Sequence, residues 1–287
     1  MERRTVALAG GTVAYVDSGD GPVAFFVHGV FLNADLWRNV ISALGEERRC
    51  IAVDLPCHGA TALPDDADLS LPALADLLEE LCASLNLGPI DLVGNDTGGA
   101  VCQVWATHHP ERLRSLTLTN CDCHDNLPPE AFRPIVDLAA AGQLAPVVQA
   151  MAADLNLAKS EAGLGSGYQH PEDLPDEVVR SFLTPLIAHD GGISLERFLT
   201  AVRAEDLLAI EPALEKLEAP TLVAWGTADQ FFEIKWAHWL RDTIPGVQEI
   251  VEVDGAKLFF PDERADELVP HLERHWARAA AAPAAEV

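Results

Sequence analysis

The sequence has 287 residues, of which 49% are hydrophobic, so it can form one large domain with a sizeable core. Lys and Arg number 19 against 45 Asp and Glu, which gives a formal net charge of -26. This charge excludes nucleic acid as a partner, because phosphate binding needs a basic face, and it disfavours an anionic membrane surface. We find no apolar core of a signal peptide and no run near the roughly 20 apolar residues of a membrane span. We expect the six cysteines to be reduced and to pack as small hydrophobic residues. We therefore expect a cytoplasmic protein without a membrane partner.

Short apolar runs alternate along the chain with longer helical stretches. The runs predict strands at 13–16, 23–27, 51–53, 90–93, 116–119, 221–225 and 249–253. Helices are expected between them at 35–44, 69–87, 99–109, 234–242 and 264–280. This alternation predicts an α/β fold, with a mostly parallel sheet of about eight strands and helices on both faces.

The alternation stops between Asp122 and about Leu217, where no strand-like run occurs. Helical stretches at 132–141, 146–157, 177–189 and 194–208 predict a helical cap instead. The predicted organisation is core 1–121, cap 122–210 and core 211–287. An insertion at the carboxyl end of a parallel sheet would cover the place where ligands bind in open α/β folds. The glycine-rich stretch 162–171 predicts a mobile flap, and the low-complexity tail 279–287 is expected to be frayed.

One segment carries the clearest chemical signal, Leu92-Val-Gly-Asn-Asp-Thr-Gly-Gly-Ala100. A buried strand ends there, and a helix begins after a tight turn. Gly94 and Gly98 flank Asp96 two residues to either side, which is the spacing of a strained strand–turn–helix elbow. Such an elbow presents one side chain at the head of a helix, where backbone N–H groups and the helix dipole favour an anion.

At these residues the sequence resembles the α/β-hydrolase fold family, in the aspartate-nucleophile branch of haloalkane dehalogenases and epoxide hydrolases. His28-Gly29 resembles the oxyanion-loop motif of that family, and the segment 54–59 resembles the stretch after its fourth strand. The resemblance implies that Asp96 is a nucleophile and that Asp229 is the acid of a catalytic triad. It also implies that the backbone N–H groups of Val30 and Thr97 form an anion hole.

Several expected parts of such a site are missing. The base of the triad would be a histidine after the eighth strand, but Leu258 stands at that position. Dehalogenases of this branch carry Trp and Asn where this chain has Thr97 and Val30. Epoxide hydrolases raise two tyrosines from the cap, whereas this cap has only Tyr168. The candidate binding residues are Val30, Thr97, Phe31, Asn95, Tyr168 and Leu258.

Four explanations remain open for the missing base. His124 follows the sixth strand and could take its place, which makes it a third candidate catalytic residue. Asp122 or Asn120, at the same strand end, could position a water molecule or a substrate polar group. Lys257 is adjacent to the lost position, although exposure to solvent is the simpler expectation for it. Finally, Leu258 could be an engineered residue that traps a covalent adduct.

No metal or cofactor is expected. The run from Cys121 to His124 has two Cys and one His, but no second Cys/His pair follows at the spacing of a zinc site. The sequence also has no glycine-rich dinucleotide or phosphate-binding motif.

The leading functional hypothesis is a hydrolase in which Asp96 attacks a small hydrophobic carbon–halogen or epoxide-like electrophile. A carboxylate that attacked an ester would give an anhydride, whereas attack on an sp³ carbon gives a stable ester. The alternatives are an isomerase, lyase or cyclase that uses Asp96 as a general acid or base, and a protein that only binds a small molecule. We expect a monomer or a homodimer, and a small hydrophobic molecule as the only partner.

Overall fold

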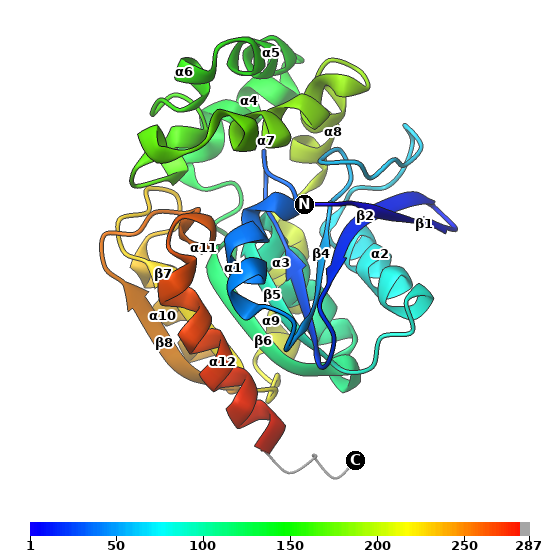
Figure 1. Ribbon diagram of the computed structural model, residues 1–287, viewed down its shortest axis with the longest axis vertical. Helices are drawn as coiled ribbons and strands as arrows, with labels where there is room; N and C mark the ends of the chain where they lie inside the picture. Colours follow the sequence, from blue (N-terminus) through cyan, green and yellow to red (C-terminus); the bar gives the residue numbers. More distant parts are fainter. Residues whose placement is uncertain (282–287) are drawn as a thin grey trace.

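The computed structural model describes residues 1–281 and contains a single eight-stranded sheet (Figure 1). The strands are β1 (Arg4–Leu8), β2 (Gly11–Ser18), β3 (Val23–Val27), β4 (Arg49–Val53), β5 (Ile90–Asp96), β6 (Leu113–Cys121), β7 (Thr221–Gly226) and β8 (Val247–Val253). Their order in the sheet is β1-β2-β4-β3-β5-β6-β7-β8. Strand β2 is antiparallel to both of its neighbours, and the strands from β4 to β8 are parallel. The predicted sheet of about eight mostly parallel strands is confirmed.

Helices cover both faces of the sheet, as predicted. The helices beside it are α1 (Arg38–Leu44), α2 (Leu71–Ser84), α3 (Thr97–His108), α9 (Ala204–Leu214), α10 (Ile234–Thr243), α11 (Phe260–Glu263) and α12 (Ala265–Ala281). Helices α1 and α12 pack together in front of the sheet in Figure 1, and α3 packs with α2 and α9 behind it. Two covered faces explain why the central strands are continuous apolar runs.

A helical layer lies over the carboxyl ends of the parallel strands (Figure 1). Its helices are α4 (Arg133–Ala140), α5 (Ala145–Ala153), α6 (Leu155–Ala158), α7 (Asp176–Ala188) and α8 (Ile193–Ala201). The described residues contain no strand between β6 and β7. The limits proposed for core and cap stay a prediction, and α9, whose first half falls in the predicted cap, packs against the core helix α3.

Within residues 1–281, no single helix is both long and apolar enough to cross a membrane. Two stretches of the cap, 130–140 and 145–153, meet the length and composition criteria only when they are counted together, and they are bent by 108°.

The structure corrects several element boundaries. The predicted helix 194–208 is two helices, because the backbone is extended at Val202 and Arg203. The predicted helix 146–157 is likewise divided at Asp154 into α5 and α6. Strand β1 was not predicted, since it lies at the sheet edge and is mostly exposed. Of the predicted frayed tail 279–287, the first three residues belong to α12, and the rest lies outside the described residues.

Candidate active site

The turn between β5 and α3 has the geometry that the two flanking glycines predict. Asp96 ends the strand with φ 56° and ψ −135°, and Thr97 begins the helix. A Cβ atom on Gly98 would lie 2.3 Å from the carbonyl oxygen of His28, and one on Gly94 would lie 2.8 Å from the carbonyl oxygen of Gly98. Both positions therefore exclude side chains, and the chain holds Asp96 in a backbone conformation that residues other than glycine seldom adopt.

The carboxyl group of Asp96 sits against the backbone of the loop after β3. The N–H group of Val30 donates to its Oδ2 atom at 2.9 Å, and the N–H group of Thr97 also donates to the carboxyl. A Cβ atom on Gly29 would lie 2.2 Å from the same Oδ2 atom, so only glycine permits this approach. Burial raises the pKa of Asp96 to about 7, against the opposing effect of the two N–H donors. Val30 and Thr97 thus each supply an N–H donor to this carboxyl group.

Two buried histidines support this loop from the core. The His28 Nε2 atom accepts the N–H group of Leu55 at 2.9 Å, so its Nδ1 atom donates to the Gly29 carbonyl at 2.7 Å. The ring of His58 lies edge-on to His28 and donates from Nδ1 to the Pro56 carbonyl. Burial lowers the pKa of both rings to about 3, so they stay neutral and act as structural hydrogen-bonding groups.

Asp229 follows β7 and is buried. Its Oδ1 atom accepts the N–H group of Phe231 and its Oδ2 atom accepts the Asn120 side-chain amide, both at 2.8 Å. Burial raises its pKa to about 7. Asp229 is absent from the cavity lining described below, so it stands behind the site as a hydrogen-bonded carboxyl group.

Leu258 lies in the loop after β8 and contributes to the wall of the same cavity as Asp96. Its side chain is buried, and its carbonyl oxygen accepts the Asn95 side-chain amide at 3.0 Å. Asn95 is buried in the core and also bonds to Thr119, so it fixes the loop that carries Leu258 instead of lining the cavity. An apolar side chain occupies the place where the triad resemblance implies a base.

A cavity of about 350 Å³ lies between the sheet and the cap. Most of its wall is apolar, and its cap side includes Leu127, Phe132, Ile135, Leu144, Val147 and Met151. In the part of the chain that the structure describes, the charged residues in the wall are Asp96, Asp122 and Glu161, and no histidine is among them. An apolar wall with a few converging polar groups is typical of a site for a small hydrophobic ligand.

Aromatic rings line the cavity where the core meets the cap. Phe31 and Phe231 both line the cavity, and each meets Phe132 of the cap edge-on, at centroid distances of 6.1 and 6.0 Å. Phe259 lines it as well. The backbone of Phe31, the residue after Val30, has a φ of 66°, which is a left-handed conformation.

Two further sequence candidates, besides Asn95 and Asp229, lie outside this lining. His124 binds Glu211 of α9 through Nδ1 and stacks on Trp239 of α10, with centroids 5.0 Å apart. Tyr168 is buried behind Phe259 and donates to the Asp262 carboxylate at 3.1 Å. Neither geometry supports contact with a substrate, so these two predicted roles receive no support from their positions.

The glycine-rich stretch 162–171 is packed into the wall. A Cβ atom on Gly165 would lie 2.0 Å from the Lys159 carbonyl oxygen, and one on Gly167 would lie 2.4 Å from the Phe259 ring. Residues 162–164 and Ser166 line the cavity. The glycines thus serve close packing, which composition alone does not distinguish from the mobility expected for a flap.

Asp122 also lines the cavity, although the sequence indicated it only as one of several alternatives. It follows β6, is 1% exposed, and accepts the Thr97 hydroxyl at Oδ2 over 2.9 Å. Burial and then the negative charge of Asp96 raise its pKa well above the usual value. The available signal was its place at a strand end on the same edge of the sheet as Asp96.

A family model described as the alpha/beta hydrolase fold matches residues 22–264. The chain belongs to the α/β-hydrolase fold family. A cis-3-alkyl-4-alkyloxetan-2-one decarboxylase of Xanthomonas campestris is 28% identical over 279 residues, covering 91% of this chain and 90% of that protein.

Solved structures share the fold of this α/β hydrolase at low sequence identity. The epoxide hydrolase CorEH has a TM-score of 0.79 at 20% identity, covering 96% of this chain and 99% of its own. The ancestral haloalkane dehalogenase AncHLD2 has a TM-score of 0.79 at 18% identity, covering 97% of this chain and 100% of its own. These likenesses concern the fold, and the reaction has to be argued from the site.

Proposed function

We propose that this α/β hydrolase uses Asp96 as a nucleophile on an sp³ carbon of a small hydrophobic substrate. The observation that carries the proposal is the position of the Asp96 carboxyl, which lines the cavity with Oδ2 held by the Val30 N–H group. Attack on a carbon that bears a halide or a strained ring oxygen gives an alkyl ester of Asp96. The N–H groups of Val30 and Thr97 are then placed to hold the ester carbonyl oxygen.

The enzyme ester should be long-lived. Leu258 lines the cavity, and no histidine of the described residues does so. General-base assistance typically accelerates such a hydrolysis by about 10²–10⁴-fold, so its loss slows the release of the ester without preventing its formation. The part of the cycle that the geometry supports best is therefore the alkylation of Asp96.

The walls of the cavity favour an uncharged, apolar electrophile, because its charged groups are acidic. The oxetan-2-one in the name of the Xanthomonas relative is a strained four-membered lactone that bears alkyl groups, and such a molecule has this character. If Asp96 attacks the ring carbon that carries the ring oxygen, a carboxylate is released on the substrate. Loss of CO₂ with departure of Asp96 then gives an alkene. This sequence of steps consumes no water, so it is compatible with Leu258 in place of a base.

Intact-protein mass spectrometry tests the proposal after incubation with haloalkanes, epoxides and alkyl oxetan-2-ones. We expect an adduct on the wild-type protein with at least one class and none on Asp96→Asn. Because Leu258→His restores a base, it should shorten the lifetime of an adduct that water can hydrolyse. The absence of any adduct, together with no gain from Leu258→His, would contradict the proposal.

One observation favours a second candidate function, proton transfer by Asp96. Burial raises the pKa of this carboxyl to about 7, which suits a general acid or base near neutral pH. A general base needs the same ionised carboxylate as a nucleophile and is distinguished from it by the absence of an adduct on Asp96. A general acid is distinguished from a nucleophile by its pH dependence. Nucleophilic attack needs the ionised carboxylate, so its rate rises with pH through about 7, whereas general-acid catalysis by Asp96 falls over the same range.

A further inference from the structure

We infer that Asp122 is a second catalytic residue, the general acid that protonates the oxygen released when Asp96 opens an epoxide. The inference rests on the proposed role of Asp96 as the nucleophile. Asp96 forms a bond to a ring carbon, the bond from that carbon to the ring oxygen breaks, and the electron pair goes to the oxygen. That oxygen takes the proton of the Asp122 carboxyl and becomes a hydroxyl group. Hydrolysis of the resulting ester releases one proton, which restores Asp122.

The position of Asp122 is fixed by its neighbours on α3. The Thr97 hydroxyl donates to Oδ2 at 2.9 Å, and the Gln103 side-chain amide donates to the Asp122 backbone carbonyl at 2.7 Å. Thr97 directly follows Asp96, so the residue that holds the acid is the immediate neighbour of the nucleophile. Asp96, Thr97 and Asp122 all contribute to the lining of the cavity.

The second oxygen of Asp122 has no partner in the described part of the chain. Its Oδ1 atom is buried and accepts no hydrogen bond. Such an atom is costly to bury unless it carries a proton or meets a ligand. A protonated carboxyl group with Oδ1 as the free oxygen can donate a hydrogen bond to a molecule in the cavity.

Two other buried carboxylates of this protein, Asp91 and Asp262, are paired with arginine, and Asp122 is not. Asp91 binds Arg48 and Arg114, and Asp262 binds Arg38. No arginine or lysine of residues 1–281 forms an ion pair with Asp122. In this part of the chain Asp96 also lacks a cation, but it accepts the N–H groups of Val30 and Thr97, whereas the Asp122 carboxyl accepts only the Thr97 hydroxyl. A buried carboxyl group with so little support for its charge is held in its neutral form, which is the form of a proton donor.

The titratable groups around Asp122 favour its protonated form. Burial, and then the charge of Asp96, raise the pKa of Asp122 well above its usual value, whereas the pKa of Asp96 is about 7. The adjacent thiols of Cys121 and Cys123 have pKa values raised by burial and stay neutral. Because the negative charge of Asp96 adds to the effect of burial on Asp122, Asp96 loses its proton first and Asp122 keeps its own. Two carboxyl groups whose environments separate their pKa values are suited to separate roles.

The acid matters for one kind of leaving group. An epoxide oxygen leaves as an alkoxide, which is strongly basic and needs a proton. A halide ion needs none and is stabilised by hydrogen-bond donors instead. The residues after the nucleophile and after Gly29 are Thr97 and Val30, which lack the side-chain N–H donors of a halide site. The site is thus suited to an oxygen leaving group.

The test compares adduct formation by an alkyl epoxide and by a bromoalkane of equal carbon number. Asp122→Asn keeps the shape and can still accept the Thr97 hydroxyl, but it cannot supply an acidic proton. We expect it to slow alkylation by the epoxide by about 10²–10⁴-fold. Alkylation by the bromoalkane should stay within about threefold of wild type, since the halide needs no acid. Asp125→Asn, an exposed acid outside the cavity lining, is the control and should change neither rate.

The pH profile provides a readout that a structural role for Asp122 would not change. The wild-type rate with the epoxide should rise through about pH 7 and fall at higher pH, as Asp122 ionises. The rate with the bromoalkane should only rise. Equal slowing of both substrates by Asp122→Asn, or no slowing of either, overturns the inference and leaves Asp96 as nucleophile intact. Absence of a wild-type adduct with the epoxide overturns this inference, and the proposed function falls as well if haloalkanes and alkyl oxetan-2-ones also give no adduct.

Discussion

At the scale of the residue, the site depends on how strongly burial changes a carboxyl group. Asp96, Asp229 and Asp262 are all buried, and burial raises the pKa of each to about 7. Between the pKa of an unfolded aspartate and this value, the folded protein binds protons that the unfolded chain does not. These groups therefore make the protein less stable as the pH rises from about 4 to about 7.

The Asp96→Asn variant should reveal how much stability is lost when the buried Asp96 carboxyl ionises. Below about pH 4 the wild-type carboxyl is protonated in both the folded and the unfolded state, so aspartate and asparagine should be similar. At pH 8 the carboxylate is ionised and buried, and asparagine should stabilise the protein by about 2–4 kcal/mol. We expect the melting temperature of the variant to exceed that of wild type by several degrees at pH 8, and we expect this excess to shrink between pH 7 and pH 4. Thermal melts across this range check the prediction, and a constant difference between the two proteins would contradict it.

The sequence predicted Asp96 at the elbow because two glycines at fixed spacing are a local signal. It did not predict where His124 and Tyr168 lie, since side-chain direction in a loop is set by distant partners. His124 has φ 53° and meets Glu211 and Trp239, which are far away in the sequence. The position of Asp122 was only weakly indicated by the sequence for the same reason, because its hydrogen bond with Thr97 forms only once the sheet has folded.

At the scale of the element, the close approach of α3 to β3 sets the geometry of Asp96, the proposed nucleophile. A Cβ atom on Gly98 would lie 2.3 Å from the His28 carbonyl oxygen and 2.5 Å from that of Val27. These are backbone atoms of a central strand and of the residue after it, so they cannot move aside without disturbing the sheet. The start of α3 would have to shift instead, and it carries the Thr97 N–H group.

We expect Gly98→Ala to lower stability by about 1–3 kcal/mol, the usual cost of inserting a methyl group into a packed region. It should also reduce alkylation of Asp96 at least tenfold, because misplacing a reacting group by about 1 Å costs up to 10²-fold. Gly88→Ala is the control, since no heavy atom lies within 4 Å of its Cβ position. Chemical denaturation and adduct mass spectrometry measure the two effects. Equal behaviour of the two variants would count against the importance of this contact.

Strands buried on both faces could be predicted from the sequence, whereas the edge strand β1 and the break between α8 and α9 could not. The run 23–27 matches β3 residue for residue because every position of a central parallel strand favours an apolar side chain. Strand β1 has no such run, because it pairs with β2 alone and is mostly exposed. The break between α8 and α9 falls at Val202 and Arg203. Neither residue is a glycine or a proline, so the local sequence did not predict the break.

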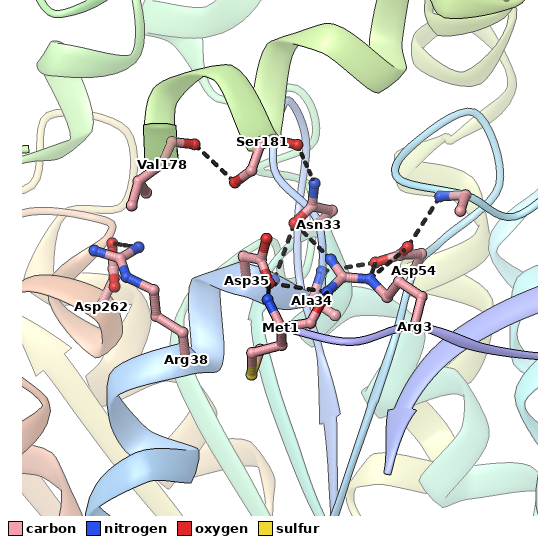
Figure 2. A network of polar contacts seen from close by, with 11 residues as sticks. Met1, Arg3, Asn33, Ala34, Asp35, Arg38, Asp54, Val178, Ser181 and Asp262 are labelled. Carbon is pink, nitrogen blue, oxygen red and sulfur yellow. Dashed lines mark hydrogen bonds and ion pairs between the residues drawn. The ribbon is translucent and has the colours of Figure 1, made fainter. Parts of the chain in front are cut away.

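At the scale of the whole molecule, one polar network joins the N-terminal segment, the loop after β3, the end of β4 and the cap (Figure 2). Arg3 binds Asp54 at 3.0 Å, Asp35 at 2.8 Å and the Asn33 side chain at 3.0 Å. Asn33 in turn donates to the Ser181 carbonyl of α7 at 2.7 Å. The network thus connects the loop that carries Val30 to the helical layer above it.

Removing Arg3 should destabilise the protein strongly. Burial raises the pKa of Asp35, but hydrogen bonds and charges from Arg3 and the terminal amine outweigh it, so the pKa is lowered. Arg3→Met leaves Asp54 and Asp35 without this partner, which typically costs about 3–5 kcal/mol. A lowered aspartate pKa stabilises above the unfolded value, so the loss should shrink as the pH falls below about 4.

Arg4→Met is the matched control for this prediction. Arg4 pairs with Asp17, but its side chain is 61% exposed, and such surface pairs contribute about 0–1 kcal/mol. Urea unfolding of the two variants at pH 7 should therefore give clearly different midpoints. Similar midpoints would mean that the network around Arg3 contributes little to holding the loop and the cap together.

The proposed nucleophile is tested most directly by locating an adduct. The wild-type protein and Asp96→Asn are incubated with a short-chain alkyl epoxide at pH 8, digested, and analysed by peptide mass spectrometry. The proposal predicts that the peptide containing Asp96 gains the full mass of the epoxide in the wild-type protein, and that Asp96→Asn shows no gain there. A modification confined to another residue, such as a cysteine, or no modification at all, would contradict Asp96 as the nucleophile.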